Sequence, residues 1–463
     1  MEAVGTRFGD AARKRLILVS CILGSAMVFV DGTVVNVALP AIQRDLGGGL
    51  TLQQWVVDAY LLTLGSLILL GGSLGDLFGE RRIFSLGVAT FGLTSVVCGV
   101  APDSNTLIAA RGLQGIAGAL LTPAALATIT ANFEGEERGA AIGTWTAWTG
   151  IGTVIGPLVG GWLVGAASWR SIFFLNVPLA LVTLVTIAIA LPRATHTREA
   201  DVDVVGAGLC VLGLGGSVFA LIEQPRRGWG DPLILGALLA GLALVAAFVL
   251  WERRAPQPML PPRLFARRNF TFANIETLFV YGALSALIFF LVLFLQQLAG
   301  YSAFQSGLAL LPATIVLFLL SRYVGRFSMR LGPRLFMGAG PLLAAAGVAL
   351  MLRLDTRLDY WTDLLPAVLV FALGLTLIVA PLTSTVLADA GAGDAGIASA
   401  VNNAVARVAG LLAIAVVGVA VAGRDARLTA HGFHIAIAIT TALLAVGGAI
   451  GFAGIRKPAA RAR

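Results

Sequence analysis

Three ionisable residues lie inside long apolar stretches of this sequence, where a charge is costly. Asp31 stands in VDGTVVNVALP, Asp58 in WVVDAY and Arg111 in LIAARG. An apolar pocket favours the neutral form of a carboxylic acid, whereas a nearby arginine favours the carboxylate. Because these influences compete, such a group can gain and lose a proton. The residue types therefore indicate a proton-binding site. The alternatives are a structural ion pair for Arg111, a helix-bending hydrogen bond for Asp31 and an interfacial position for Asp58.

The composition places these residues in a membrane protein. The chain has 463 residues, 58% of them hydrophobic and 12% charged, with a mean hydropathy of +0.90. Ordinary soluble domains are about 25% charged. The net charge of +8 does not indicate a nucleic-acid partner, because membrane proteins collect basic residues in their cytoplasmic loops. The three cysteines and three histidines show no metal-ligand spacing, so we expect no metal site and no cofactor beyond a proton gradient.

Apolar segments long enough to cross a bilayer recur along the whole chain. A membrane helix needs about 20 mostly apolar residues. The sequence contains fourteen candidates, which are Leu16–Leu39, Trp55–Gly75, Ile83–Val100, Thr106–Ile129, Ala140–Val164, Ile172–Leu191, Val204–Leu221, Pro232–Trp251, Phe272–Gln296, Phe304–Leu320, Leu335–Leu352, Leu364–Leu387, Gly396–Val421 and Ile435–Ile455. We therefore expect an all-α integral membrane protein.

The basic residues predict the orientation of these spans. With both termini in the cytoplasm, the inner segments hold roughly three times as many Lys and Arg residues as the outer ones. In this orientation Asp31, fifteen residues after Leu16, is about 22 Å along its helix. Asp58 and Arg111 lie near the outer ends of the next even-numbered spans. The three side chains are thus predicted at similar depth, where they could share one aqueous pocket.

A charged, glycine-rich turn follows the second span. GSLGDLFGERR contains Gly72, Asp76, Gly79, Arg81 and Arg82, in which glycines permit a tight turn and Asp76 can pair with arginines. A weaker repeat, GRFSMRLGPR, follows the tenth span without an acidic counterpart to Asp76. The alternative interpretation of both is a set of positive charges that anchors cytoplasmic loops.

Small residues recur every four positions in the fifth span. Gly152, Gly156 and Gly160 would form one smooth helix face, which lets another helix approach closely. Pro157 removes a backbone hydrogen bond and favours a kink. With Gly161, these residues complete the pattern GTVIGPLVGG.

Together these motifs resemble the major facilitator superfamily, and more narrowly its fourteen-helix drug:proton antiporter family. The resemblance rests on the turn after span two, RGLQGIAG from Arg111, the glycine pattern of span five and DGTVVNVALP. It implies a conformational latch in the turn, proton coupling at Arg111 and an antiporter motif in span five.

The resemblance also implies a domain organisation. It predicts two six-helix bundles, at residues 1–191 and 272–463, two additional helices at residues 192–252 and a cytoplasmic linker at residues 253–271. The bundles would work by alternating access in a monomer.

Polar residues in the second half are candidates for a substrate cavity. They are Glu276, Gln296, Gln297, Asn402, Asn403 and Arg407. Glu276 could instead be interfacial. Several phenylalanines of the ninth span could line the cavity, with lipid contact as the alternative.

The sequence therefore predicts a multi-pass protein of the plasma membrane. We expect proton-coupled export of small, amphipathic and cationic drugs or antibiotics. A lipid or metabolite exporter on the same scaffold is the alternative. An enzyme or a receptor is disfavoured, because no catalytic group, phosphate-binding loop or sizeable soluble domain is evident.

Overall fold

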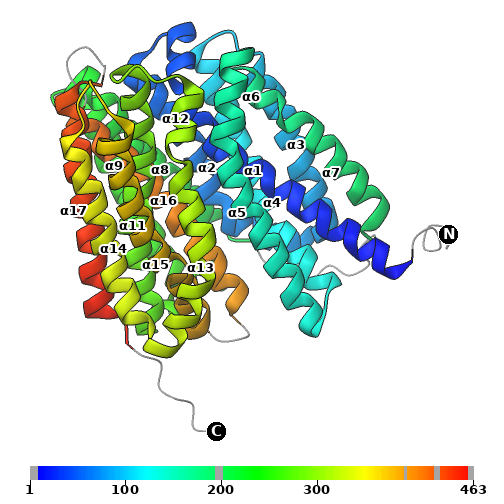
Figure 1. Ribbon diagram of the computed structural model, residues 1–463. Helices are drawn as coiled ribbons and strands as arrows, with labels where there is room; N and C mark the ends of the chain where they lie inside the picture. The colour runs from blue at the N-terminus through cyan, green and yellow to red at the C-terminus, as the bar shows by residue number, and fades with distance from the viewer. Residues whose placement is uncertain (1–8, 193–201, 391–393, 422–427, 457–463) are drawn as a thin grey trace.

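Helices make up all the regular structure that can be described. The computed structural model describes residues 9–192, 202–390, 394–421 and 428–456, without the side chains of residues 153, 154 and 329. The elements (Figure 1) are α1 (Asp10–Leu46), α2 (Gly49–Phe78), α3 (Glu80–Gly99), α4 (Ser104–Asn132), α5 (Gly135–Ala166), α6 (Ser171–Phe174), α7 (Asn176–Ala190), α8 (Val204–Arg227), α9 (Pro232–Glu252), α10 (Pro262–Phe265), α11 (Arg268–Gln297), α12 (Ala303–Ala309), α13 (Leu311–Leu331), α14 (Pro333–Leu350), η1 (Met351–Arg353), η2 (Tyr360–Leu364), α15 (Leu365–Ala390), α16 (Ala395–Val421) and α17 (Ala430–Gly454).

The predicted number of membrane spans is confirmed. Among the described residues, 14 helices are long and apolar enough to cross a membrane, and each matches one predicted span. Most are longer than expected, because their apolar core continues into polar turns. Helix α1 has 37 residues, or about 55 Å at 1.5 Å per residue, and so exceeds a hydrocarbon core of about 30 Å. The sixth span is broken at Leu175, and the tenth at Leu310.

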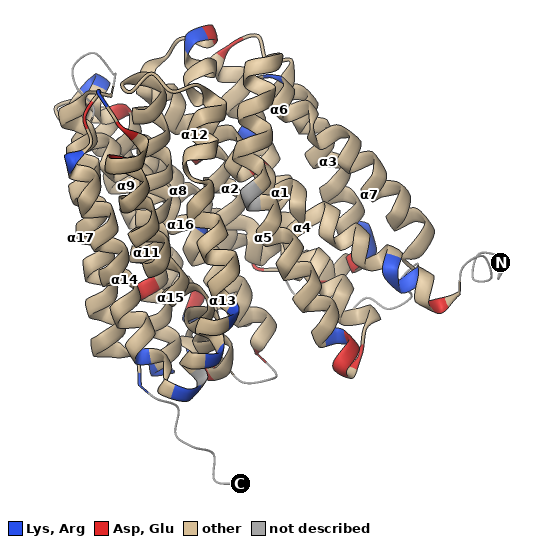
Figure 2. Cartoon of the chain, viewed as in Figure 1, with Lys and Arg blue, Asp and Glu red and all other residues tan. Residues whose placement is uncertain are grey.

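The helices gather into two groups with an inserted pair. Helices α1 to α7 pack on one another, α11 to α17 form the second group, and α8 packs on α9 and touches both α2 and α16. The described chain begins and ends at the same end of the molecule (Figure 1), which we call the terminal side. Figure 2 shows charge gathered mainly at the two ends of the helices. This arrangement suits a protein that spans a bilayer.

The weak sequence repeat corresponds to a repeated structure. Gly79 ends α2 with φ 92°, and Gly332 ends α13 with φ 91°, so both turns need a residue without a side chain. Two residues later, Arg81 donates to the carbonyl of Leu191 at the end of α7. At the equivalent position Arg334 donates to the carbonyl of Phe452 near the end of α17. Each arginine thus caps the last helix of its own group.

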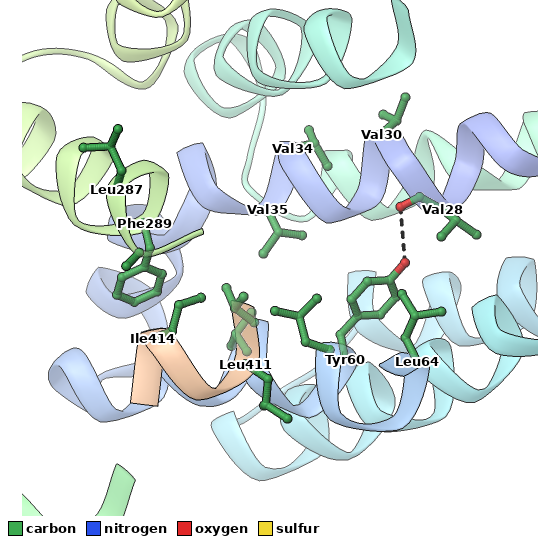
Figure 3. Packing of buried hydrophobic residues seen from close by; sticks show 14 of the residues in the cluster. Val28, Val30, Val34, Val35, Tyr60, Leu64, Leu287, Phe289, Leu411 and Ile414 are labelled. Atoms are coloured by element: carbon green, nitrogen blue, oxygen red, sulfur yellow. Dashed lines mark hydrogen bonds between the residues drawn. The ribbon is translucent and has the colours of Figure 1, made fainter. Parts of the chain in front are cut away.

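The two groups meet mainly on the far side of the molecule, opposite the termini. Within the described chain, their extensive contacts join α1 to α11 and α12, α2 to α16, and α5 to α12. Valines of α1, Phe289 of α11 and Ile414 of α16 pack into one apolar core there (Figure 3). Towards the terminal side the groups diverge (Figure 1).

Candidate functional site

Asp31 lies in a closed polar cluster inside the first group. Arg111 Nη1 donates to Asp31 Oδ2 at 2.5 Å, and Gln114 Nε2 and Asn176 Nδ2 donate to Asp31 Oδ1 at 3.0 and 3.2 Å. Ser95 Oγ accepts from both amides. Asp31 is 0% exposed and Arg111 1%. The predicted pair therefore exists, but it is dry rather than set in an aqueous pocket.

Four helices bring this cluster together. Arg111 and Gln114 are three residues apart on α4 and so share a helix face, while α1, α3 and α7 supply Asp31, Ser95 and Asn176. The remaining donors of Arg111 reach the carbonyl of Val56 and the amide oxygen of Gln114. Three side chains thus donate to the two carboxyl oxygens of Asp31.

Tyr60 continues the cluster towards the second group. Its ring lies under the Arg111 guanidinium at 4.3 Å, and its hydroxyl donates to the carbonyl of Val28 (Figure 3). The sequence analysis assigned no role to Tyr60, Ser95, Asn176 or Gln114. Each of them places a polar side chain inside an apolar span. That feature identifies a member of the cluster only when it is known which face of each helix points at Asp31.

Asp58 does not join this cluster. It is completely buried, and neither carboxyl oxygen has a hydrogen-bond partner. Asp58 lies four residues after Gln54 and three before Leu61, and both of these neighbours contact α16. The same helix face therefore points Asp58 at α16. The expectation of one pocket shared by Asp31, Asp58 and Arg111 is wrong, because equal depth does not fix the direction of a side chain.

Glu276 is buried inside the second group. It is 0% exposed, and its carboxyl oxygens also lack partners. Phe272 and Val280, four residues to either side, contact glycines of α17, so this face of α11 points at α17. Glu276 is therefore neither a cavity acid nor an interfacial one in this conformation.

Gln296 and Gln297 join the two groups on the far side. Gln296 Nε2 donates to the carbonyl of Val37 at 2.9 Å, and Gln297 Nε2 donates to Gln43 Oε1 at 3.0 Å. Gln53 donates to the same oxygen of Gln43. These two candidates for the substrate cavity thus close the far side in this conformation.

The remaining candidates lie on α16. Asn402 donates to Asn274 and Thr277 of α11, whereas Asn403 donates to the carbonyl of Ser399. Arg407 reaches the first group and is half-buried.

The Arg407 guanidinium stacks over Phe29 of α1 at 5.4 Å, and its Cβ lies beside Gly65 of α2. In the described part of the chain Arg407 has no acidic partner. It is a candidate cation at the contact of α16 with α1 and α2.

The fold and these sites can be compared with known proteins. The family model for the Major Facilitator Superfamily matches residues 21–414. The chain belongs to the Major Facilitator Superfamily. The puromycin resistance protein of Streptomyces alboniger is 39% identical over 450 residues, which cover 92% of this chain and 88% of that protein. The tetracenomycin C resistance and export protein of Streptomyces glaucescens is 35% identical over 410 residues, covering 88% and 76%.

A solved structure shows the same fold. A bacterial homologue of the lysosomal transporter Spinster, described as inward-facing, has a TM-score of 0.67 at 18% identity and covers 96% of this chain and 97% of its own. The major facilitator fold predicted from the sequence is therefore confirmed. The chain is a membrane transporter rather than an enzyme. Its described residues hold no group of three or more potential metal ligands.

The glycine stripe of this major facilitator protein packs against the helix that carries Asp31. A Cβ on Gly152 would lie 3.4 Å from Val30, and one on Gly156 or Gly160 would collide with Thr33 or Val34 of α1. Pro157 and Gly161 face α12 instead, where Gly307 lies against the carbonyl of Pro157. Helix α5 therefore links α1 of one group to α12 of the other.

The charged turn does not join the two groups in this conformation. Asp76 is exposed and makes no hydrogen bond or ion pair among the described residues, and Arg82 is also exposed. Gly72 faces α4, and a Cβ atom placed on it would lie 3.7 Å from the Cβ atom of Pro123. If the turn is a latch, this is its released state.

Proposed function

We propose that this chain is a proton-coupled antiporter that exports small amphipathic drugs or antibiotics across the plasma membrane. The observation that carries the proposal is the buried Asp31–Arg111 pair, whose 2.5 Å contact is further held by Gln114 and Asn176. An ionisable pair inside membrane helices is expensive, so it indicates function by default. Relatives named for antibiotic resistance and export support the substrate class.

Orientation follows from the distribution of charge. We propose that both termini are cytoplasmic, because the basic residues concentrate on their side. In that orientation the far-side contacts of Gln296 and Gln297 close the protein to the outside. The divergence of the two groups towards the terminal side then makes this an inward-open state.

A transport cycle can be built on this state. Residues 1–191 and 272–463 would rock as two bodies, with residues 192–252 and 253–271 as inserted pair and linker. When the outside opens, a proton reaches Asp31 and frees Arg111. When the inside opens, Arg111 again favours the carboxylate, and the proton leaves. Export of substrate in the opposite direction is then driven by the proton gradient, and one chain is sufficient.

The charge of the substrate is where the structure departs from the sequence analysis. The expected preference for cations depended on acids that face the substrate. Asp31 is neutralised by Arg111, and Asp58 and Glu276 point into helix interfaces. Arg407 is the accessible charge instead. We therefore propose that neutral amphipathic compounds are exported at least as well as monocations.

Transport by purified protein tests this function. Proteoliposomes with an imposed pH gradient would be loaded with matched cationic and neutral compounds, and lipid export would be followed in parallel. We expect gradient-dependent movement of the compounds that Asp31→Asn abolishes. Gradient-independent movement would contradict antiport, and movement of lipid alone would favour a lipid exporter. A strong preference for the cation would restore the expectation from the sequence.

A further inference from the structure

A pair of carboxyl groups joins the inserted helices at the terminal side, away from the sites above. Asp203 precedes α8, and its Oδ1 accepts hydrogen bonds from Gly206 N at 2.7 Å and Trp251 Nε1 at 2.8 Å. Glu252 ends α9, and its Oε2 accepts from Leu260 N at 2.8 Å. Glu252 is only 3% exposed. One oxygen of each carboxyl group is therefore well satisfied.

The other two oxygens face each other without a donor. Asp203 Oδ2 and Glu252 Oε1 are both buried, and neither has a hydrogen-bond partner among the described residues. Both atoms lie where a side chain on Gly206 would be, the Glu252 oxygen 2.8 Å from that Cβ position. Two carboxylates in contact repel each other, whereas a carboxylate and a carboxylic acid share a hydrogen bond. The contact therefore requires a proton.

No described cation takes the place of that proton. Helix α8 contributes the thiol of Cys210 to the surroundings, and α2 contributes the buried hydroxyl of Ser66, which has no hydrogen-bond partner among the described residues. Arg253 and Arg254 follow Glu252 but are exposed. The sequence between them and Arg263 carries no charged side chain.

The pair also holds the linker between the two groups of helices. Met259 packs with Ala207 of α8 and Phe248 of α9 in a small apolar cluster, which includes leucines of α2. Leu260 lies against the same cluster and gives its amide to Glu252. Packing and the Leu260–Glu252 hydrogen bond thus fasten the linker to the inserted pair at this point.

Helix α8 is in turn attached along α2. Trp55 Nε1 donates to Glu223 Oε1 at 3.0 Å at the far side, and Gly215 lies against Leu62 midway. The inserted pair is therefore attached to the first group, and α8 also touches α16 of the second group. Fastening the linker to this pair ties the segment that leads into the second group to the body of the first.

We propose that Asp203 and Glu252 share one proton and form a pH-sensitive clasp for the linker. With the proton present, the pair is closed, and Glu252 holds Leu260. Loss of the proton leaves two buried carboxylates in contact, which separates the end of α9 from the start of α8 and frees the linker amide. Because the pair lies outside the proposed transport path, the clasp senses pH on the terminal side independently of substrate.

Hydrogen exchange of the full chain in lipid nanodiscs tests this clasp. Prolines flank this segment, so Met259 and Leu260 supply two adjacent amides that can be followed by mass spectrometry. After correction for the intrinsic pH dependence of exchange, we expect protection of the Leu260 amide to fall at least about tenfold between about pH 6 and pH 9. Protection that does not change over this range would overturn the proposal.

Four variants separate the clasp from general stability. Glu252→Gln and Asp203→Asn supply a permanent donor, so in each protection should stay high and independent of pH. Gly206→Ala places a methyl group between the carboxyl groups and should lower protection at every pH. Glu223→Gln, at the other end of α8, should behave like the wild type. Equal pH dependence in wild type and both amide variants contradicts the shared proton, whatever the transport assay shows.

Discussion

At the scale of single residues, the paired and the unpaired buried acids have different consequences. Asp31 accepts three hydrogen bonds, whereas the oxygens of Asp58 and Glu276 accept none. An isolated ion is far costlier in a low-dielectric interior than a paired one. The hydrogen bonds and the ion pair therefore offset the burial of Asp31, whereas no described partner offsets the burial of the other two acids.

Replacement of Asp31 should stop coupled transport without unfolding the protein. Asp31→Asn keeps the size of the side chain and most of its hydrogen bonds but cannot bind and release a proton. Export driven by a pH gradient should fall to background in proteoliposomes, while the protein still inserts but melts at a lower temperature, because Arg111 is left buried without its carboxylate. The exposed acid Asp10 gives a control, and Asp10→Asn should transport normally. Full export by Asp31→Asn would remove the coupling role.

Loss of Arg111 should mainly affect stability. Arg111→Ala leaves the Asp31 charge buried and unpaired, which costs about 3–5 kcal/mol for comparable buried pairs. The double variant with Asp31→Asn removes both charges and should recover part of this loss. Thermal unfolding in detergent measures both effects. Additive losses in the double variant would mean that the two side chains do not depend on each other.

At the scale of elements, α5 is the helix whose surface was best predicted. Its glycines allow contact with α1 beside Asp31, and Gly161 lies against α12 of the second group. Helix packing in membranes depends on such small residues, because lipid gives no hydrophobic drive for association. Movement at Asp31 can thus be transmitted to the second group through α5.

A larger side chain on the stripe should block this movement. Gly156→Leu would collide with Thr33 and the carbonyl of Val30, forcing α5 away from α1. We expect transport to be lost and the melting temperature to fall. Gly165 on the same helix has open space, so Gly165→Leu is the matched control and should retain activity. A normal rate in Gly156→Leu would show that close contact is not required.

At the scale of the whole molecule, the conformation explains the positions of the residues predicted to form a latch. Arg81 caps α7 within its own group, and Asp76 has no described partner, while the groups diverge at this end. The far-side contacts of Gln296 and Gln297 hold the opposite end. A latch at Asp76 would form only when the terminal side closes.

Replacement of Asp76 in the predicted latch should change the proportion of molecules that are closed on the terminal side. Asp76→Asn should deplete the state closed on the terminal side, because it loses a charge that only this state uses. Spin labels at Glu136 of α5 and Arg326 of α13, both exposed, would report the separation of the groups in protein without native cysteines. We expect a smaller population of short distances between the two spin labels than in the wild type. Unchanged distances would show that Asp76 is not a latch.

The sequence by itself determined the membrane spans, because each span must satisfy its backbone within one helix and leaves an apolar signature. The fold was predicted from the resemblance of the motifs to the major facilitator superfamily. It also determined that Asp31 and Arg111 lie at similar depth, since helix rise fixes position along the axis. The repeated turn that contains Gly79 in one copy and Gly332 in the other was also recognised from the sequence. These properties are local, and a single stretch of chain carries each of them.

Only the tertiary structure decided which side chains meet. Rotation of each helix about its axis turned Asp31 towards Arg111, Asp58 towards α16 and Glu276 towards α17. That rotation depends on how all the neighbouring helices pack, and no single span encodes it. For the same reason, the proximity of Asp203 and Glu252 emerged only when α8 and α9 were placed side by side.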